Sequence, residues 1–158
     1  IVLVSACLGK NIKTTVSFDP SEVAFINQMG SAKIEGQGFL RQNGGGVVTC
    51  AGSNVWLVPA GRYATERMTQ IYGNKDGGKI TVLEGANGKN RDPRYVSHMK
   101  EAVCDAEGDF EFNNVANGDY YLLTSVTWTV GSNIFPEGGS IAKRIEVRGG
   151  VSERFILN

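Results

Sequence analysis

The sequence predicts an all-β protein, a β-sandwich of about seven strands with an irregular, partly helical insertion. Twenty-one glycines and only four prolines are scattered between short apolar runs, a pattern that indicates many turns joining strands. These runs alternate apolar and polar residues, with turn signals about every eight to twelve residues, as in a sandwich. A length of 158 residues is enough for one domain with a proper hydrophobic core.

The chain opens with an apolar run that ends in Val4-Ser5-Ala6-Cys7. An aliphatic residue, two small residues and a cysteine are how a bacterial lipoprotein signal ends, because the peptidase holds an extended backbone in a narrow site. We therefore expect residues 1–6 to end a signal peptide and Cys7 to carry the lipid. The alternative is a buried N-terminal strand with an isolated cysteine. No run of about 18 apolar residues, the length a membrane-spanning helix needs, is present.

Residues 7–31 are expected to link the lipidated cysteine to the domain. From Ile12 to Phe18 apolar and polar side chains alternate, and Pro20 ends the pattern. Alternation at period two places the apolar side chains on one face of an extended segment. Since a pure tether would be less apolar, we expect Asn11 to Phe18 to be a strand-like segment that packs on the domain or on a partner.

The sandwich domain is expected over residues 32–158. Its first strand is predicted at 33–41 ("KIEGQGFLR"), followed by a turn at 43–46 and a short strand at 47–50. Residues 55–59 ("VWLVP") are apolar on both faces. This composition favours a strand whose two faces are both covered.

The regular pattern breaks between about residues 60 and 100. Tyr63 to Tyr72 carries apolar residues at helical spacing and predicts a short amphipathic helix, and residues 79–83 predict a small strand. An insertion of about forty residues is unusual in a compact domain and is often where function lies.

From Glu101 onward strands and turns alternate again. Turns are expected at 105–109 and at Asn117-Gly118. In the strand that begins at Tyr120, even-numbered and odd-numbered side chains should line opposite faces. The last two strands are joined at Gly149-Gly150, a favoured dipeptide for a tight hairpin.

The stretch "CDAEGDFEFNNVANGDYYLL" resembles the carboxypeptidase regulatory-like domain, a transthyretin-like β-sandwich. That family carries an Asp-x-x-Gly turn, an aromatic strand residue, a short apolar loop and a Gly-x-Tyr step into another strand. The matching residues here are Asp105, Gly108, Phe110, Val115, Gly118 and Tyr120. The resemblance covers about residues 33–59 and 104–158 and implies an accessory, folding or binding module. It implies the fold more firmly than a function.

Physical reasons agree with the resemblance at four positions. Gly108 and Gly118 suit backbone positions with positive φ. Asp105 can cap its own turn through its side chain. The hydroxyl of Tyr120 can bond a backbone carbonyl near a strand corner, as sandwich tyrosines do.

The three cysteines are Cys7, Cys50 and Cys104. Lipidation of Cys7 leaves an even pair, so we expect a disulfide between Cys50 and Cys104 in the oxidising cell envelope. Two buried free thiols are the alternative. No Cys-x-x-Cys pair or Cys/His cluster indicates zinc.

The sequence offers little for catalysis, and we expect neither an enzyme nor a cofactor or metal. His98 follows Ser97, but a relay needs contact in space and an orienting acid, so a loop histidine is the simpler interpretation. No nucleophile elbow, metalloprotease or nucleotide-binding motif is present. The alternating acids over residues 105–111 can supply calcium ligands or simply form a solvated turn.

Ligand or partner contacts are most plausible in the insertion. Its tyrosines belong to an irregular region and are expected to be exposed, where flat rings can stack on sugars. Its basic residues can contact an acidic group, with a solvated surface as the alternative. The predicted contact residues are Tyr63, Arg67, Tyr72, Arg94 and Tyr95. Trp56 and Trp128 lie in strands, where core packing is favoured.

These observations predict a non-catalytic lipoprotein of the bacterial outer membrane, facing the periplasm or the cell surface. Equal numbers of basic and acidic residues give no global reason to bind nucleic acid, so the lipid would hold the protein to the membrane. The sandwich would serve as a structural or protein-interaction module of an envelope assembly, with Asn11 to Phe18 adding to a partner's sheet edge. The alternative is a carbohydrate-binding module that uses the aromatic residues of the insertion.

Overall fold

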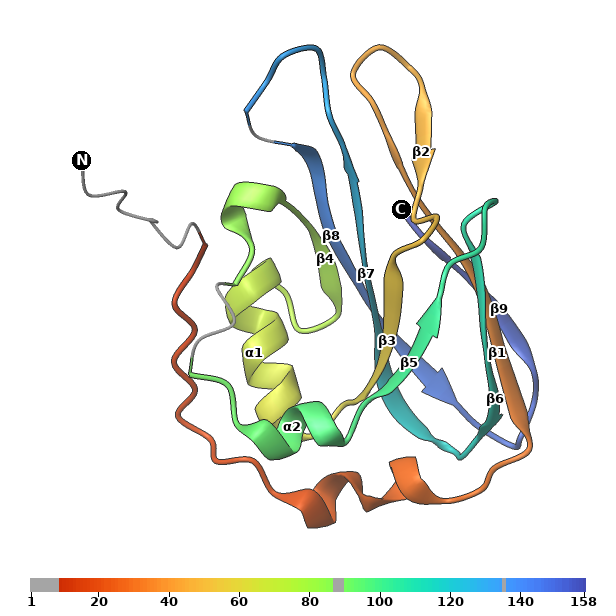
Figure 1. Cartoon of the computed structure of the whole chain (residues 1–158). Coiled ribbons are helices and arrows are strands. Elements are labelled where there is room, and N and C mark those ends of the chain that lie inside the picture. Colours follow the sequence, from red (N-terminus) through yellow and green to blue (C-terminus); the bar gives the residue numbers. More distant parts are fainter. Residues whose placement is uncertain (1–8, 87–89, 135) are drawn as a thin grey trace.

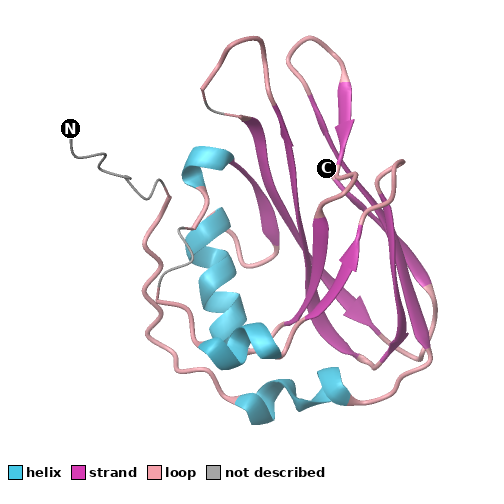
Figure 2. Cartoon of the chain, viewed as in Figure 1, coloured by secondary structure: helices cyan, strands magenta, loops and turns pink. Residues whose placement is uncertain are grey.

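The computed structural model describes residues 9–86, 90–134 and 136–158. Two β-sheets pack face to face, and a layer of short helices covers the other face of one of them (Figure 1). Figure 2 shows most of the helices on one side of the strands, with the helical segment nearest the N-terminus beneath the lower end of the strands. The predicted β-sandwich is confirmed. Helices of the insertion form a third layer, while its strand at residues 77–81 joins one of the sheets.

The first sheet has four strands in the described part of the chain and is built around β1 (Ala32–Arg41). On one edge, β1 pairs antiparallel with β6 (Asp109–Val115) and then with β2 (Val47–Thr49). On its other edge, β1 pairs parallel with β9 (Glu153–Leu157). The strands predicted at 33–41 and 47–50 are therefore confirmed.

The second sheet has five described strands in the order β4-β8-β7-β3-β5. They are β4 (Gly77–Thr81), β8 (Glu137–Val147), β7 (Gly118–Trp128), β3 (Asn54–Pro59) and β5 (Lys100–Val103). All pairs in this sheet are antiparallel. The long β7–β8 ladder is its centre.

The alternation predicted for β7 explains the three layers. Tyr120, Leu122 and Val126 point into the space between the sheets, whereas Tyr121 and Leu123 point to the helical layer. A strand with two apolar faces must be covered on both sides. The sandwich core draws on both sheets and includes Ile34, Cys50, Val55, Leu57, Phe110, Phe112, Val115, Tyr120, Leu122, Val126, Ile141, Ile145 and Leu157.

The helical layer contains α1 (Arg62–Tyr72), α2 (Pro93–Ser97), and the 3-10 helices η1 (Pro20–Asn27) and η2 (Val82–Glu84). The predicted helix in the insertion is thus confirmed as α1. It ends at Gly73, whose φ of 74° is left-handed and suits glycine. None of the described helices is long and apolar enough to cross a membrane.

The C-terminal strand departs from the predicted hairpin. Gly149 and Gly150 both have φ of 64°, yet β9 does not return along β8. Because β8 already lies between β4 and β7, the chain crosses to the other sheet and takes the free edge of β1. The dipeptide indicated the turn but not the sheet that the last strand would join.

The turn residues behave as predicted, with one exception. Asp105 accepts hydrogen bonds from the backbone N–H groups of Glu107 and Asp109, and Gly108 has φ of 83°. The Tyr120 hydroxyl donates to the carbonyl of Ala116 at 2.8 Å, and burial raises its pKa to about 12. Gly118 is not among the residues with positive φ.

Gly118 is required for a different reason, which is close packing. A Cβ at this position would lie 2.3 Å from the ring of Phe25. The ring of Phe25 also packs edge-on against Tyr120, with centroids 5.3 Å apart. The glycine therefore lets η1 approach the start of β7.

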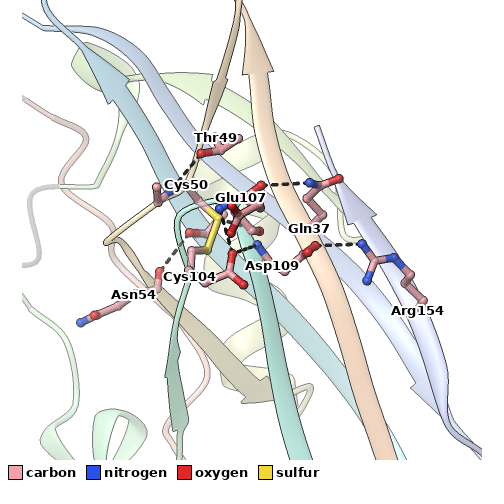
Figure 3. Close-up of a disulfide and its surroundings, with 12 residues drawn as sticks. Gln37, Thr49, Cys50, Asn54, Cys104, Glu107, Asp109 and Arg154 are labelled. Carbon is pink, nitrogen blue, oxygen red and sulfur yellow. Dashed lines mark hydrogen bonds and ion pairs between the residues drawn. A yellow bond between two sulfur atoms is a disulfide. The ribbon is translucent and has the colours of Figure 1, made fainter.

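The predicted disulfide is present between Cys50 and Cys104, with Cα atoms 5.8 Å apart (Figure 3). Cys50 lies between β2 and β3, and Cys104 lies between β5 and β6. Both connections carry the chain from one sheet to the other. The disulfide therefore joins two crossovers of the sandwich.

The N-terminal segment packs on the domain and forms no strand in its described part. Ile12 and Phe18 are buried. The carboxylate of Glu66 on α1 accepts hydrogen bonds from the backbone N–H groups of Thr15 and Val16. The expected packing on the domain is present, but the expected strand is not. The backbone N–H groups of this segment donate to a side chain and not to the edge of a sheet. The expected signal end and Cys7 lie outside the described residues.

Replacing both Cys50 and Cys104 with Ala should lower the free energy of unfolding by about 3–4 kcal/mol, since the bond closes a loop of more than fifty residues. Urea denaturation with and without a reducing agent measures this. Reduction should destabilise the parent protein by a similar amount and leave the double variant unchanged. A parent protein indifferent to reduction would contradict the assignment.

Replacing Glu66 with Gln should loosen residues 11–18, detected as faster proteolysis there. The bonds from Thr15 and Val16 hold the pKa of Glu66 below its usual value. A depressed folded-state pKa means that the stabilisation is present above about pH 4.3 and is lost as pH falls through the folded-state value. The difference between parent and variant should therefore shrink in acid. The exposed Glu153→Gln change is the control, and equal proteolysis of both variants would refute the contact.

Candidate functional site

The outer face of the five-stranded sheet carries two adjoining hollows, with volumes of about 490 and 440 Å³. They share Trp56, Leu123, Ser125 and Ser140. We call this continuous depression the outer groove. Each hollow is within the size range of small-ligand sites.

The floor of the outer groove is the part of the sheet that α1 leaves uncovered. Outward-facing residues of β7 change along the strand from buried Tyr121 to half-buried Leu123 and exposed Ser125 and Thr127. The half-buried ring of Trp56 lies on the neighbouring strand β3. The floor therefore offers an aromatic ring beside hydroxyl groups.

The walls come from the insertion. They include residues of α1, among them Arg67, Met68 and Tyr72, and the residues Tyr95 and Met99, in and just after α2. The Tyr72 hydroxyl and Ser140 Oγ lie 2.6 Å apart and tie the end of α1 to β8. Burial raises the pKa of Tyr72, so the hydroxyl stays protonated at neutral pH.

The charge in this wall is Arg67. Its side chain is only 3% exposed, and its Nη1 atom has no hydrogen-bond partner. The centre of its guanidinium group lies 5.8 Å from the ring of Tyr63 and 5.7 Å from the ring of Tyr95. Arg91 also lines the groove, and the described lining contains no Asp or Glu. The site is thus positively charged.

The predicted contact residues separate into two groups. Arg67, Tyr72 and Tyr95 line the outer groove, whereas Tyr63 and Arg94 do not. Asp92 caps α2 by accepting a hydrogen bond from the backbone N–H of Arg94, and the Arg94 guanidinium pairs with the same carboxylate at 2.8 Å. Its guanidinium also donates to the carbonyl of Phe18.

The expectation that the tyrosines are exposed is wrong for Tyr63 and Tyr95, which are 5% and 4% exposed. Their rings pack edge-on at 5.1 Å, and both contact Phe18. Desolvation in this cluster raises the pKa of Tyr95. These rings form the core of the helical layer, so truncating either to Ala would test stability rather than binding.

Trp128 lies at a different hollow, of about 440 Å³, at the end of the sandwich. Phe39, Leu40 and Arg41 line the same hollow. The indole N–H of Trp128 donates to Glu137 at 3.2 Å. The hollow at Trp128 has no buried charged side chain among the described residues. The outer groove, which has one, is therefore the stronger candidate site.

His98 shows no relay geometry. Its Nδ1 lies 2.7 Å from the carbonyl of Arg94, which fixes this nitrogen as the proton-bearing one. The Ser97 hydroxyl donates to the same carbonyl, and Phe18 packs on the imidazole at 5.3 Å. Within the described ranges, no group of three or more His, Cys, Asp or Glu side chains is placed to hold a metal ion.

Sequence reasoning missed the polar floor. Ser125, Thr127 and Ser140 carry no motif, and only the uncovered end of the sheet gives them a role. Trp56 was assigned to the core, but its ring is half-buried and borders both hollows. The signal for Arg67 was present, because a basic residue occupies a position on the apolar stripe of α1.

Comparison with solved structures gives matches, of which one is informative about function. A solved structure from Pseudomonas aeruginosa, described as a "putative carbohydrate binding protein", superposes with a TM-score of 0.71 at 27% identity. The match covers 90% of this chain and 97% of that one. No protein-family profile matches the chain, and no curated protein matches it significantly. The unmatched tenth of the chain is shorter than the insertion, so the similarity extends beyond the sandwich into at least part of the insertion.

Proposed function

We propose that the chain is a non-catalytic carbohydrate-binding module whose ligand lies in the outer groove. The observation that carries this proposal is the near-complete structural similarity to the Pseudomonas aeruginosa protein, at 27% identity over 90% of this chain. The unmatched tenth of the chain is shorter than the insertion, so the similarity reaches at least part of the insertion, whose residues line the walls of the groove.

The chemistry of the groove supports a sugar ligand. A pyranose ring has a flat apolar face that stacks on an aromatic ring, and a rim of hydroxyls that needs donors and acceptors. Trp56 supplies the ring. Ser125, Thr127 and Ser140 supply hydroxyls on the same floor. The apolar and polar requirements are thus met side by side.

A protein-interaction module working by strand addition has less support. Strand addition needs free main-chain groups. In the described structure, the N–H groups of Thr15 and Val16 are bonded to Glu66, and the Lys13 carbonyl accepts from Gln70. Ile12 and Phe18 are also buried against the domain. Pairing with a partner would first require this segment to detach.

Lipid anchoring at Cys7 in the outer membrane remains part of the proposal, together with the resemblance to carboxypeptidase regulatory-like domains. Its support is the Val4-Ser5-Ala6-Cys7 sequence. Intact mass spectrometry of protein purified from membranes, after expression with its full signal, tests it. The expected mass is that of a chain beginning at Cys7 with diacylglycerol and an acyl chain. An unmodified chain that retains Ile1 to Ala6 would refute it.

Replacing Trp56 with Ala should weaken glycan binding by roughly tenfold or more, because a buried aromatic contact contributes more than about 1 kcal/mol. A glycan array identifies the ligand, and isothermal titration calorimetry measures the affinity. Trp56→Phe should retain part of the binding. Thermal unfolding shows that each variant is folded.

Trp128→Ala is the matched control, since Trp128 is also half-buried in the same sheet but lines the other hollow. Its affinity should equal that of the parent. If Trp128→Ala lost binding while Trp56→Ala kept the parent affinity, the ligand site would lie at the sandwich end instead. An array with no binding by the parent protein would overturn the proposed function.

A further inference from the structure

We propose that Arg67 makes the outer groove selective for a carboxylate-bearing sugar, such as a uronic acid residue of a glycan. This inference rests on the proposed function and specifies its ligand. It starts from the position of Arg67 on the buried stripe of α1, one turn after Tyr63 and one turn before Ile71. A charged residue is almost never fully buried unless it is paired.

Arg67 differs from five of the other seven arginines and from the other buried polar residue of the described chain. Thr124, equally buried, donates its hydroxyl to the Asn54 carbonyl at 3.0 Å. The Nη1 atom of Arg67 has no hydrogen-bond partner among the described residues and is closed off from solvent. Five arginines that are more exposed than Arg67 do have carboxylate partners. They are Arg62, Arg94, Arg144, Arg148 and Arg154. The chain thus leaves its most buried guanidinium uncompensated.

Folding alone gives no reason to retain this charge. Removing an ion from water costs several kcal/mol unless a partner and further hydrogen bonds offset the cost. The rings of Tyr63 and Tyr95, at 5.8 and 5.7 Å, offset part of this cost, because cation–π contacts are stronger when desolvated. The rings accept no N–H···O or N–H···N hydrogen bond, and the two N–H groups on Nη1 have no partner among the described residues. Those donors are available to a ligand.

The surroundings select an anion of carboxylate geometry. The guanidinium fork matches a carboxylate in a bidentate manner. No described Asp or Glu lines the groove to compete, and Arg91 adds positive charge. The hydroxyl of Tyr72 and the ring of Trp56 border the same hollow and suit the rest of a sugar. A neutral sugar would leave the buried charge unpaired.

A ligand can reach Nη1 of Arg67 only after a local movement, since surrounding protein atoms shield this atom from solvent. Met68 and Met99 line the hollow with Arg67, and methionine side chains are flexible enough to repack. Side-chain rotamer changes of this kind are common when a ligand or partner binds. The backbone of α1 and the sheet can stay as they are.

The test uses calorimetry with an oligosaccharide of glucuronic acid, the same oligosaccharide with its carboxylates reduced to alcohols, and a sulfated oligosaccharide without uronic acid. The parent protein should bind the uronic form at least tenfold more tightly than the other two. Equal affinity for the uronic and reduced forms would overturn the inference and leave the proposed function standing. A sulfated ligand that binds as tightly would overturn the carboxylate assignment. No binding to any probe would overturn this inference, whereas the glycan array alone decides the proposed function.

The variant Arg67→Met should lose the preference for the uronic form while keeping affinity for the reduced one. Its ligand-free melting temperature should be unchanged or higher, because an unpaired buried charge is removed at similar volume. Arg67→Lys keeps the charge without the fork and should lose most of the preference. Arg62→Met, on the same helix but outside the groove, is the control and should behave like the parent.

A purely structural role for Arg67 gives a different pattern. In that case Arg67→Met lowers the melting temperature and weakens both ligands equally. A retained preference in a folded Arg67→Met protein would show that another group reads the carboxylate. Either result would overturn the inference.

Discussion

The fold depends on covering both faces of the five-stranded sheet. Strand β7 directs Tyr120 and Leu122 to one face and Tyr121 and Leu123 to the other, all of them apolar or aromatic. The four-stranded sheet covers the first face, and α1 with the segment leading to η1 covers only part of the second. Where α1 ends, the sheet turns polar at Ser125 and Thr127. The outer groove is therefore the boundary between a covered and an uncovered part of one surface.

The sequence predicted those features that short-range chemistry decides. The alternation of β7, the helical spacing of α1, the Asp105 turn and the Tyr120 hydroxyl bond each involve residues close in the chain. The disulfide was predicted from cysteine counting and an expected oxidising compartment rather than from geometry. These signals were sufficient for the fold class.

Features decided by distant partners were missed. The free edge of β1 determines where β9 pairs. The ring of Phe25 leaves no room for a Cβ at Gly118, and the ring of Phe18 helps to bury Tyr63. No local pattern encodes such contacts. The same holds for the candidate site, because Arg67 was recognisable on its helix whereas the hydroxyls of its floor were not. An unpaired buried charge also accords with the general trade-off between stability and function in binding sites.

The most direct test of the account is an amide and side-chain ¹H–¹⁵N NMR titration of the labelled protein with a glucuronic acid oligosaccharide. The account predicts that the largest shifts occur at the Arg67 Nε–H, the Trp56 indole N–H and the backbone amides of Ser125 and Ser140. Shifts concentrated at the Trp128 indole and at Phe39 and Leu40 would place the ligand at the sandwich end. That result would contradict the central claim.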